Sequence, residues 1–255
     1  MCATCGCDDQ GYRMDGHQHG HGPHAGHGHE DAGGVRTITL QEKVLARNDA
    51  LAAENRDWLR QRGVLAVNLM SSPGSGKTTL LERTALDLSG QAAISVIEGD
   101  QETELDAGRI RAAGCPVVQI NTGTGCHLDA AMVAGALRSL DPPAGSVVVI
   151  ENVGNLVCPA LFDLGEAARV VIASVPEGAD KPAKYPAMFR RADLVLITKT
   201  DLLPYLDFNT GECEAAIKRA SPAARILQVS ARTGDGMAGW YGWLRESPGQ
   251  PGHPG

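Results

Sequence analysis

The run from Ser71 to Thr78, Ser-Ser-Pro-Gly-Ser-Gly-Lys-Thr, constrains the fold of this chain more than any other part of its sequence. It follows an aliphatic run, 64–70, and precedes the apolar pair Leu80-Leu81. Strand, glycine-rich turn and helix therefore occur in the order of a phosphate-binding loop, although Ser71 stands where the strict pattern has glycine. Glycines let such a loop curl, so that its N–H groups and the helix N-terminus face the phosphates. The chain is predicted to bind a nucleotide.

Short runs of β-branched and aliphatic residues recur along the chain and alternate with segments of helical character. The seven runs are 64–70, 94–98, 117–120, 147–151, 170–175, 194–198 and 226–229. Strands that alternate with helices predict a parallel sheet covered on both faces. We therefore expect an α/β chain with the three-layer P-loop NTPase fold and a mostly parallel sheet. Ligands of such sheets bind at the carboxyl ends of the strands.

The two ends of the chain differ in composition from this apolar part. Residues 1–36 hold almost no branched aliphatic side chains and are predicted to form a disordered Cys- and His-rich arm, and residues 248–255 a disordered tail. Between them, residues 37–247 have the length of one domain. Its first helix should begin near Thr39, where residues 39–42 have capping-box spacing, and should end near Gly63.

Charge and cysteine content limit the partners and the compartment. The formal net charge is -7 and the basic residues are scattered, so nucleic acid is not expected as a partner. No run approaches the roughly 18 apolar residues that span a bilayer, and the N-terminus does not resemble a signal peptide, so we expect a cytoplasmic protein without membrane contact. Seven cysteines are an odd number, and in a reducing compartment they are better interpreted as thiols than as disulfides.

Each part of the phosphate site has a predicted role. Lys77 should reach the β and γ oxygens, and Thr78 should ligate magnesium. Glu151, at the end of the run 147–151, takes the place of the acid that senses the γ-phosphate, and Asp100 is a second candidate for the magnesium shell. Lys77, Asp100 and Glu151 are thus the catalytic candidates, but either acid can instead be a solvated strand-end carboxylate or a helix cap. The nucleotide-binding residues predicted from the loop are Gly74, Ser75, Gly76, Lys77, Thr78 and Thr79.

A second motif, Thr198-Lys199-Thr200-Asp201, indicates that the base is guanine. Asp201 could accept hydrogen bonds from N1 and N2 of guanine, whereas adenine would leave the carboxylate unpaired. The stem of Lys199 could pack on the base with its ammonium in solvent. Thr198 replaces the Asn of the usual pattern, which should weaken GTP affinity without changing the choice of base. Ser230 and Ala231 follow another strand and should offer backbone N–H groups to the guanine oxygen.

The arm carries two sets of metal ligands. Three thiols within six residues can wrap one thiophilic ion. The imidazoles that follow are separated by glycines and suit nickel, zinc or copper, so the tract is predicted to store or deliver metal; a solvated linker or a tag is the alternative. The arm ligands are Cys2, Cys5, Cys7, His17, His19, His21, His24, His27 and His29.

A third metal site is predicted inside the domain. Cys126 and His127 follow a glycine-rich turn, and Cys158 lies seven residues beyond Glu151. Both segments follow strands, so both could reach the same edge of the sheet. Three ligands leave coordination incomplete, which fits a site completed across a dimer or left open for transfer. The alternative is that these cysteines are small buried hydrophobes, as we interpret Cys115 and Cys213.

Taken together, these motifs resemble those of the hydrogenase nickel-incorporation GTPases, maturation factors of the SIMIBI class of P-loop proteins. The resemblance covers nearly the whole chain after the His tract, plus its opening cysteines. It implies slow, magnesium-dependent GTP hydrolysis, a homodimer favoured by GTP, and delivery of nickel to the hydrogenase large subunit with a partner metallochaperone. It also implies that Cys126, His127 and Cys158 form the nucleotide-coupled metal site. The further motifs that carry it lie at 97–100, 106–109, 121–128, 151–159 and 177–186.

Two other functions fit parts of the sequence. The related urease-side nickel GTPases share the class and the His-rich arm, although the opening cysteines and the interior Cys-His pair with Cys158 favour the hydrogenase branch. A nickel or zinc storage protein with a vestigial nucleotide site is the second alternative, and retention of Lys77, Thr78 and Asp201 argues against it. Ligand softness permits zinc as well as nickel at the interior site.

Overall fold

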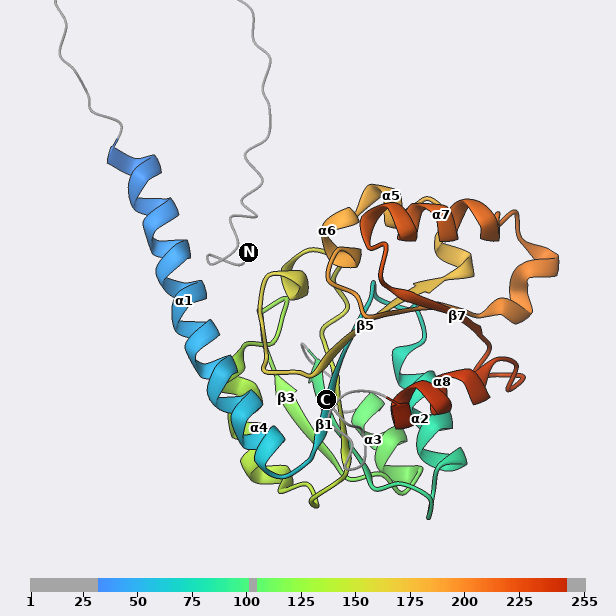
Figure 1. The fold of residues 1–255 in the computed structure, drawn as a ribbon, viewed down its shortest axis with the longest axis horizontal. Helices are drawn as coiled ribbons and strands as arrows, with labels where there is room; N and C mark the ends of the chain where they lie inside the picture. The colour runs from blue at the N-terminus through green and yellow to red at the C-terminus, as the bar shows by residue number, and fades with distance from the viewer. Residues whose placement is uncertain (1–31, 101–104, 247–255) are drawn as a thin grey trace, which may run out of the picture.

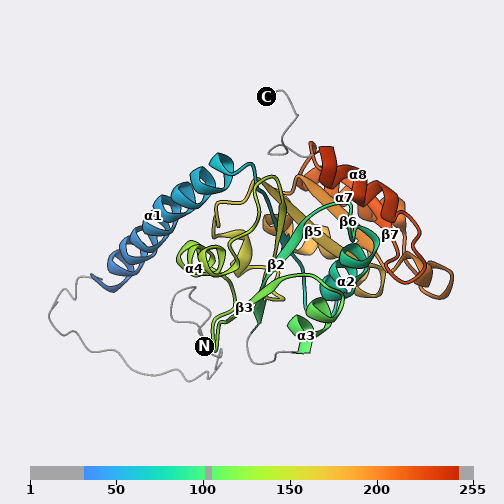
Figure 2. The same cartoon turned by 90° about the horizontal axis from the view of Figure 1, so that it is seen from below.

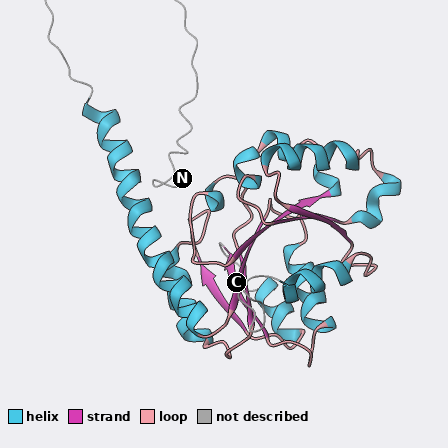
Figure 3. Cartoon of the chain, in the orientation of Figure 1, coloured by secondary structure: helices cyan, strands magenta, loops and turns pink. Residues whose placement is uncertain are grey.

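A seven-stranded parallel sheet forms the centre of the protein in the computed structural model, which describes residues 32–100 and 105–246 (Figures 1 and 3). The strand order across the sheet is β3-β2-β4-β1-β5-β6-β7, and each neighbouring pair is parallel. All seven predicted strands are confirmed, with ends that differ by at most two residues. The strands are β1 (Leu65–Met70), β2 (Ile94–Asp100), β3 (Val117–Asn121), β4 (Val147–Glu151), β5 (Ala168–Ser174), β6 (Leu194–Thr198) and β7 (Arg225–Val229).

Helices cover both faces of the sheet, as the alternation of strands and helices predicts (Figure 2). Successive residues of β1 point to opposite faces. Leu65 lies in a core with Leu80 and Trp240, whereas Ala66 lies in a core with Leu59 on the other side. One face is covered by α2 (Lys77–Asp87), α3 (Leu105–Ala112) and α8 (Met237–Glu246). The other is covered by α1 (Ala32–Gln61), α4 (Ala130–Leu140), α6 (Pro186–Phe189) and α7 (Thr210–Ala220), with the short α5 (Lys181–Lys184) packed against α7.

The first helix is longer than the sequence predicts. α1 begins at Ala32, so Thr39 lies inside it and the predicted capping box is wrong. No proline interrupts these 30 residues, and a capping sequence alone does not prevent a helix from continuing upstream. The end was predicted correctly, since Gly63 follows with a φ of 62° and donates its N–H to Arg60 O at 3.0 Å. In Figure 1 the lower part of α1 lies beside α4 and the upper part extends away from the sheet.

Residues 1–31 of the arm and the whole tail lie outside the described residues, whereas residues 32–36, predicted as part of the arm, belong to α1. The predicted start of the tail, and the metal ligands from Cys2 to His29, stay predictions. Within 32–100 and 105–246, no helix is both long enough and apolar enough to cross a lipid bilayer.

The parallel arrangement fixes where a site can form. β1, β2, β4, β6 and β7 all end at the same edge of the sheet, because each neighbouring pair runs in the same direction. The loops after these strands carry the phosphate-binding loop and most other candidate side chains. Buried side chains on both faces of β1, β4, β5 and β6 hold that edge in place.

Candidate nucleotide site and metal centre

The loop after β1 has the backbone conformation that phosphate binding needs. Gly74 and Gly76 have φ angles of 72° and 99°, which residues other than glycine rarely adopt. No side chain caps the N-terminus of α2, so its N–H groups are left facing the loop. Ser71, at the position of the missing glycine, accepts hydrogen bonds from Ser75 Oγ at 2.5 Å and Lys77 Nζ at 2.9 Å. The Ser71 hydroxyl thus connects the start of the loop to Ser75 and Lys77 near its end.

Lys77 lies at the base of this loop and is almost fully buried. Burial lowers its pKa, and the charges of Glu151, Asp106, Glu177 and Asp100 oppose that change without cancelling it. A buried ammonium is stabilised when an anion comes close. The phosphate oxygens of a nucleotide are anions that fit this position.

Two buried carboxylates lie side by side next to the loop. The register of β2 and β4 pairs Glu98 with Glu151. Burial, and then repulsion from Glu151, raises the pKa of Glu98 to about 8. Burial likewise raises the pKa of Glu151 to about 7, although Lys77 and a hydrogen bond from Thr78 Oγ1 to Glu151 Oε1 at 2.9 Å act in the opposite direction. Among the described residues, Oε2 of each glutamate has no hydrogen-bond partner. Oxygen donors of this kind suit Mg²⁺.

These groups line one cavity of about 430 Å³. Glu98 is among them, although it was not predicted as a site residue; the available signal was an acidic residue directly after the apolar residues of β2. A second residue that the sequence did not single out for this site is the cation Arg109 of α3, which pairs with Glu82 at 2.7 Å and Asp106 at 3.5 Å and lines the same cavity. The predicted residues that the structure brings together there are Gly74, Gly76, Lys77, Thr78, Thr79, Asp100 and Glu151, with Lys199 at the margin.

A second cavity, of about 230 Å³, adjoins the first and matches the predicted base site. Asp201 lines it and accepts a hydrogen bond from Ser230 Oγ at 2.7 Å. The backbone N–H of Ser230 instead donates to Asp235 O at 2.9 Å, so the prediction that this N–H faces guanine is wrong. The N–H is used by a hydrogen bond within the tight turn between β7 and α8. Ala231 lines the cavity as expected, and so does Ser75.

The base loop is tied directly to the phosphate loop. Thr198 Oγ1 donates to Ser75 O at 3.0 Å, so the threonine that replaces the usual asparagine still joins the two loops. Lys199 adopts the left-handed conformation, with φ at 59°. Its ammonium, predicted to lie in solvent, donates to Gly74 O at 2.7 Å in a hydrogen bond that is itself exposed. The P-loop carbonyl offers a fixed acceptor within reach, and the stem of Lys199 still lines both cavities.

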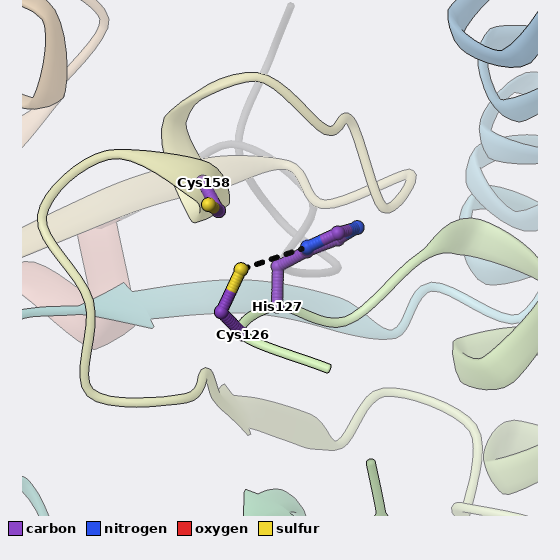
Figure 4. A group of neighbouring side chains, drawn as sticks. All are labelled: Cys126, His127 and Cys158. Carbon is purple, nitrogen blue, oxygen red and sulfur yellow. Dashed lines mark hydrogen bonds between the residues drawn. The ribbon is translucent and has the colours of Figure 1, made fainter. Parts of the chain in front are cut away.

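Cys126, His127 and Cys158 come together in space, as Figure 4 shows. One possible ligand atom from each lies within 4.8 Å of the other two, and Cys126 Sγ is 3.7 Å from His127 Nδ1. Cys158 starts the short 3-10 helix η1 (Cys158–Ala160) and is 1% exposed. Two sulfurs and one imidazole suit nickel or zinc, and a fourth position is left to be filled from elsewhere.

Neighbouring side chains orient these ligands. The ring of His127 stacks on Phe162 with 3.9 Å between the ring centroids. Burial lowers the pKa of His127, and nearby Asp129 opposes this change. Burial therefore favours the neutral form of the imidazole, which is the form that binds metal. Asn155 Oδ1 accepts from the N–H groups of Val157 at 2.8 Å and Cys158 at 3.4 Å, which fixes the turn that presents Cys158.

The other two described cysteines do not belong to this centre. Cys115 and Cys213 are buried among apolar side chains, as predicted. Burial raises the pKa of each thiol to about 11. Thiols with such a pKa are poor metal ligands at neutral pH.

Proteins similar to this chain have descriptions that name nucleotide binding and nickel. A profile of the nucleotide-binding domain of CobW/HypB/UreG proteins matches residues 65–228. The chain is 58% identical over 212 residues to the hydrogenase maturation factor HypB of Rhizobium leguminosarum bv. viciae, covering 83% of this chain and 71% of that protein. It is 42% identical over 286 alignment positions to HypB of Escherichia coli (strain K12), covering 96% and 98%. The crystal structure of HypB from Helicobacter pylori in complex with nickel has a TM-score of 0.75 and 39% identity, covering 82% of this chain and 100% of that one.

Proposed function

This chain belongs to the CobW/HypB/UreG family and, within it, to the hydrogenase maturation factors HypB, and from this premise we propose that it is a metal-regulated GTP hydrolase. It binds nickel and, through GTP binding and hydrolysis, helps to insert nickel into the hydrogenase large subunit. One observation supports this proposal most strongly. Cys158 of the metal centre lies only seven residues after Glu151, which lines the phosphate cavity.

Asp201 is the residue that selects guanine in this proposal. The hydrogen bond from Ser230 Oγ fixes the direction of its carboxylate. Guanine N1 and N2 both donate, so they match a carboxylate held in the base cavity, whereas adenine would leave it unpaired. The stem of Lys199 can pack on the base while its ammonium stays on Gly74 O.

Hydrolysis requires positive charge around the phosphates and an oriented water. Lys77 supplies one cation, and Arg109 can supply another if it leaves Glu82. Magnesium would be held by Thr78, Asp100 and Glu151, where it supplies positive charge to the β and γ oxygens. The donor set fits, since Glu151 meets the Thr78 hydroxyl and keeps a buried oxygen without a partner among the described residues. Orientation of the attacking water is assigned to Glu151 or Asp100.

Nickel is the cargo rather than a resident cofactor. Cys126, His127 and Cys158 are its proposed ligands, and the same donor set accepts zinc. An incomplete set of three favours completion across a homodimer formed with GTP, or transfer to a partner metallochaperone and the hydrogenase large subunit. The cysteines and histidines of the arm are proposed to gather metal without sensing the nucleotide. Thiol ligands stay reduced in the cytoplasm, where we place this function.

A two-state switch couples the two sites in this proposal. Gly154 packs on the phosphate loop so closely that a Cβ at this position would lie 2.9 Å from Pro73 Cα. A shift of the loop on GTP binding would therefore move the segment from Glu151 to Cys158. Metal affinity would then depend on the nucleotide, and by linkage nucleotide affinity would depend on metal.

Two assays test this proposal on the full-length protein. Phosphate release from GTP should be measurable with magnesium and should be lost in Lys77→Ala. Nickel titrations should give different affinities in GDP and in a non-hydrolysable GTP analogue, and Cys158→Ala should remove that difference. An unchanged nucleotide dependence in Cys158→Ala would contradict the coupling, and absence of phosphate release would leave a storage protein. Incubation with extracts of apo-hydrogenase and apo-urease distinguishes the hydrogenase function from the urease alternative.

A further inference from the structure

We propose that Leu128 is a positioning residue that transmits the state of the nucleotide cavity to Cys126 and His127. It is held between Asn152 on one side and Gly99 on the other, and each of these lies next to a candidate magnesium ligand. The inference rests on the proposed function, because it describes how that function is regulated. Cys158 is joined to Glu151 by the chain between them, whereas Leu128 would connect the nucleotide cavity to the other two ligands, Cys126 and His127.

The first contact is made by the side chain of Asn152, which directly follows Glu151 and is 1% exposed. Its Oδ1 accepts the N–H of Leu128 at 3.2 Å and that of Val153 at 3.0 Å. The N–H of Leu128 belongs to the peptide bond that begins with the carbonyl of His127. Asn152 therefore holds the peptide next to a metal ligand, and it is attached by the chain to a residue of the phosphate cavity.

Asn152 is itself fixed from the interior of the sheet. Its Nδ2 donates to Asn68 Oδ1 of β1 at 3.2 Å, and Asn68 Nδ2 donates to Glu166 Oε1 at 3.3 Å. Glu166 is also bound by Arg169 Nε at 2.6 Å. All of these side chains are buried, and breaking one bond would leave a polar group without a partner. Asn152 thus moves with β1 and with its own loop after β4 rather than as a free side chain.

The second contact is made by the side chain of Leu128, which is fully buried. It packs on Gly99, where a Cβ would lie 2.8 Å from Leu128 Cγ, so a larger residue at this position would require the Leu128 side chain to shift. Gly99 lies between Glu98 and Asp100 and lines the phosphate cavity. Close packing transmits displacement, because the two groups cannot be compressed further. A shift at the end of β2 must then shift Leu128.

The turn before the metal ligands is tied to the same strand end. Thr122 donates its N–H to Asp100 O at 2.9 Å and its hydroxyl to Gly125 O at 2.9 Å. Cys126 follows directly. The segment of Cys126 and His127 is thus anchored before and after the ligands to residues at the ends of β2 and β4.

A residue that only filled the core would behave differently. Leu128 belongs to the apolar core between the sheet and α1 with α4, so its truncation must lower stability in any case. A purely structural role leaves the nickel-dependent change in nucleotide affinity as it is in wild type. A positioning role reduces that change.

The test measures the affinity of the full-length protein for a fluorescent non-hydrolysable GTP analogue, with and without saturating nickel. Wild type should show a change of about fivefold or more, the usual lower range for coupled sites. Leu128→Ala should reduce the change to below about twofold. Leu128→Val, a smaller truncation, should give an intermediate value. It replaces Leu128→Ala in this test if circular dichroism shows that Leu128→Ala does not fold.

A double-mutant cycle separates the contact from general effects. Gly99→Ala should alter the nickel-dependent change, and it should have no further effect in Leu128→Ala, because its methyl then meets no leucine. Gly242→Ala is the matched control, since its Cβ would have no heavy atom within 4 Å, and it should behave as wild type. A wild-type value in every folded Leu128 variant would overturn this inference alone. No nickel effect in the wild-type protein would overturn the proposed coupling, and this inference with it.

Discussion

Replacing Gly154 by alanine should destabilise the nucleotide-free protein by about 1–3 kcal/mol, the usual cost of overpacking. The new methyl would lie 2.9 Å from Pro73 Cα and 3.0 Å from Pro73 N. Both are backbone atoms of the phosphate loop, so neither can turn aside as the end of a flexible side chain can. An ordinary carbon contact of about 3.5–4.0 Å therefore requires the loop and the segment after β4 to separate by about half an ångström or more.

Thermal unfolding followed by circular dichroism checks this prediction. In a domain of this size 1 kcal/mol changes Tm by about 2–4 °C, so Gly154→Ala should lower Tm by about 2–12 °C. Gly242→Ala, an open position in α8, should match wild type or gain up to about 1 kcal/mol, since alanine favours the helix. Equal Tm values for Gly154→Ala and wild type would refute the close packing of this segment on the phosphate loop.

Three further predictions concern single side chains. Ser230→Ala should weaken GTP binding about fivefold, as expected for the loss of roughly 1 kcal/mol when Asp201 loses its hydrogen bond. A titration with a fluorescent non-hydrolysable GTP analogue measures this affinity, and an unchanged value would contradict the role of Ser230. Thr198→Val should lower the free energy of unfolding in urea by about 1 kcal/mol, because Ser75 O loses its donor, and Thr198→Ser should retain most of it. Glu98 has a pKa of about 8 in the folded protein against a reference of 4.5, so between these pH values the nucleotide- and magnesium-free protein binds more protons than the unfolded chain. Its free energy of unfolding should therefore fall as pH rises through this range. Glu98→Gln should flatten that slope, and an unchanged slope would argue against the raised pKa.

The strands were predictable because sequence and burial agree along them. The run 147–151 is β-branched almost throughout and becomes β4, whose residues are all buried. The phosphate and base motifs were equally readable, since each combines particular residue types with a position directly after a strand. The carboxyl edge of a parallel sheet then placed these motifs together without further information.

Other features depend on contacts that sequence spacing does not contain. Glu98 looks like any strand-end acid until the register places it beside Glu151. The predicted role of the Ser230 N–H failed because Asp235, five residues later, turns back to accept it. Thr39 has a capping pattern, but the helix continues through it to Ala32. For Glu98 and Ser230 a contact between strands or within a turn decided the outcome, whereas at Thr39 the helix continues upstream of the capping pattern.

The central claim is that the nucleotide cavity and the metal centre form one coupled unit. The most direct measurement is a closed linkage cycle on wild-type protein: nickel affinity in GDP and in the GTP analogue, and the affinity for each nucleotide with and without nickel. Coupled sites must change each other's affinity by the same factor, and we predict a factor of about five or more. Cys158→Ala should reduce it to one, because Cys158 is the ligand attached to the segment from Glu151. Nucleotide affinities that are identical with and without nickel in wild type would contradict the account.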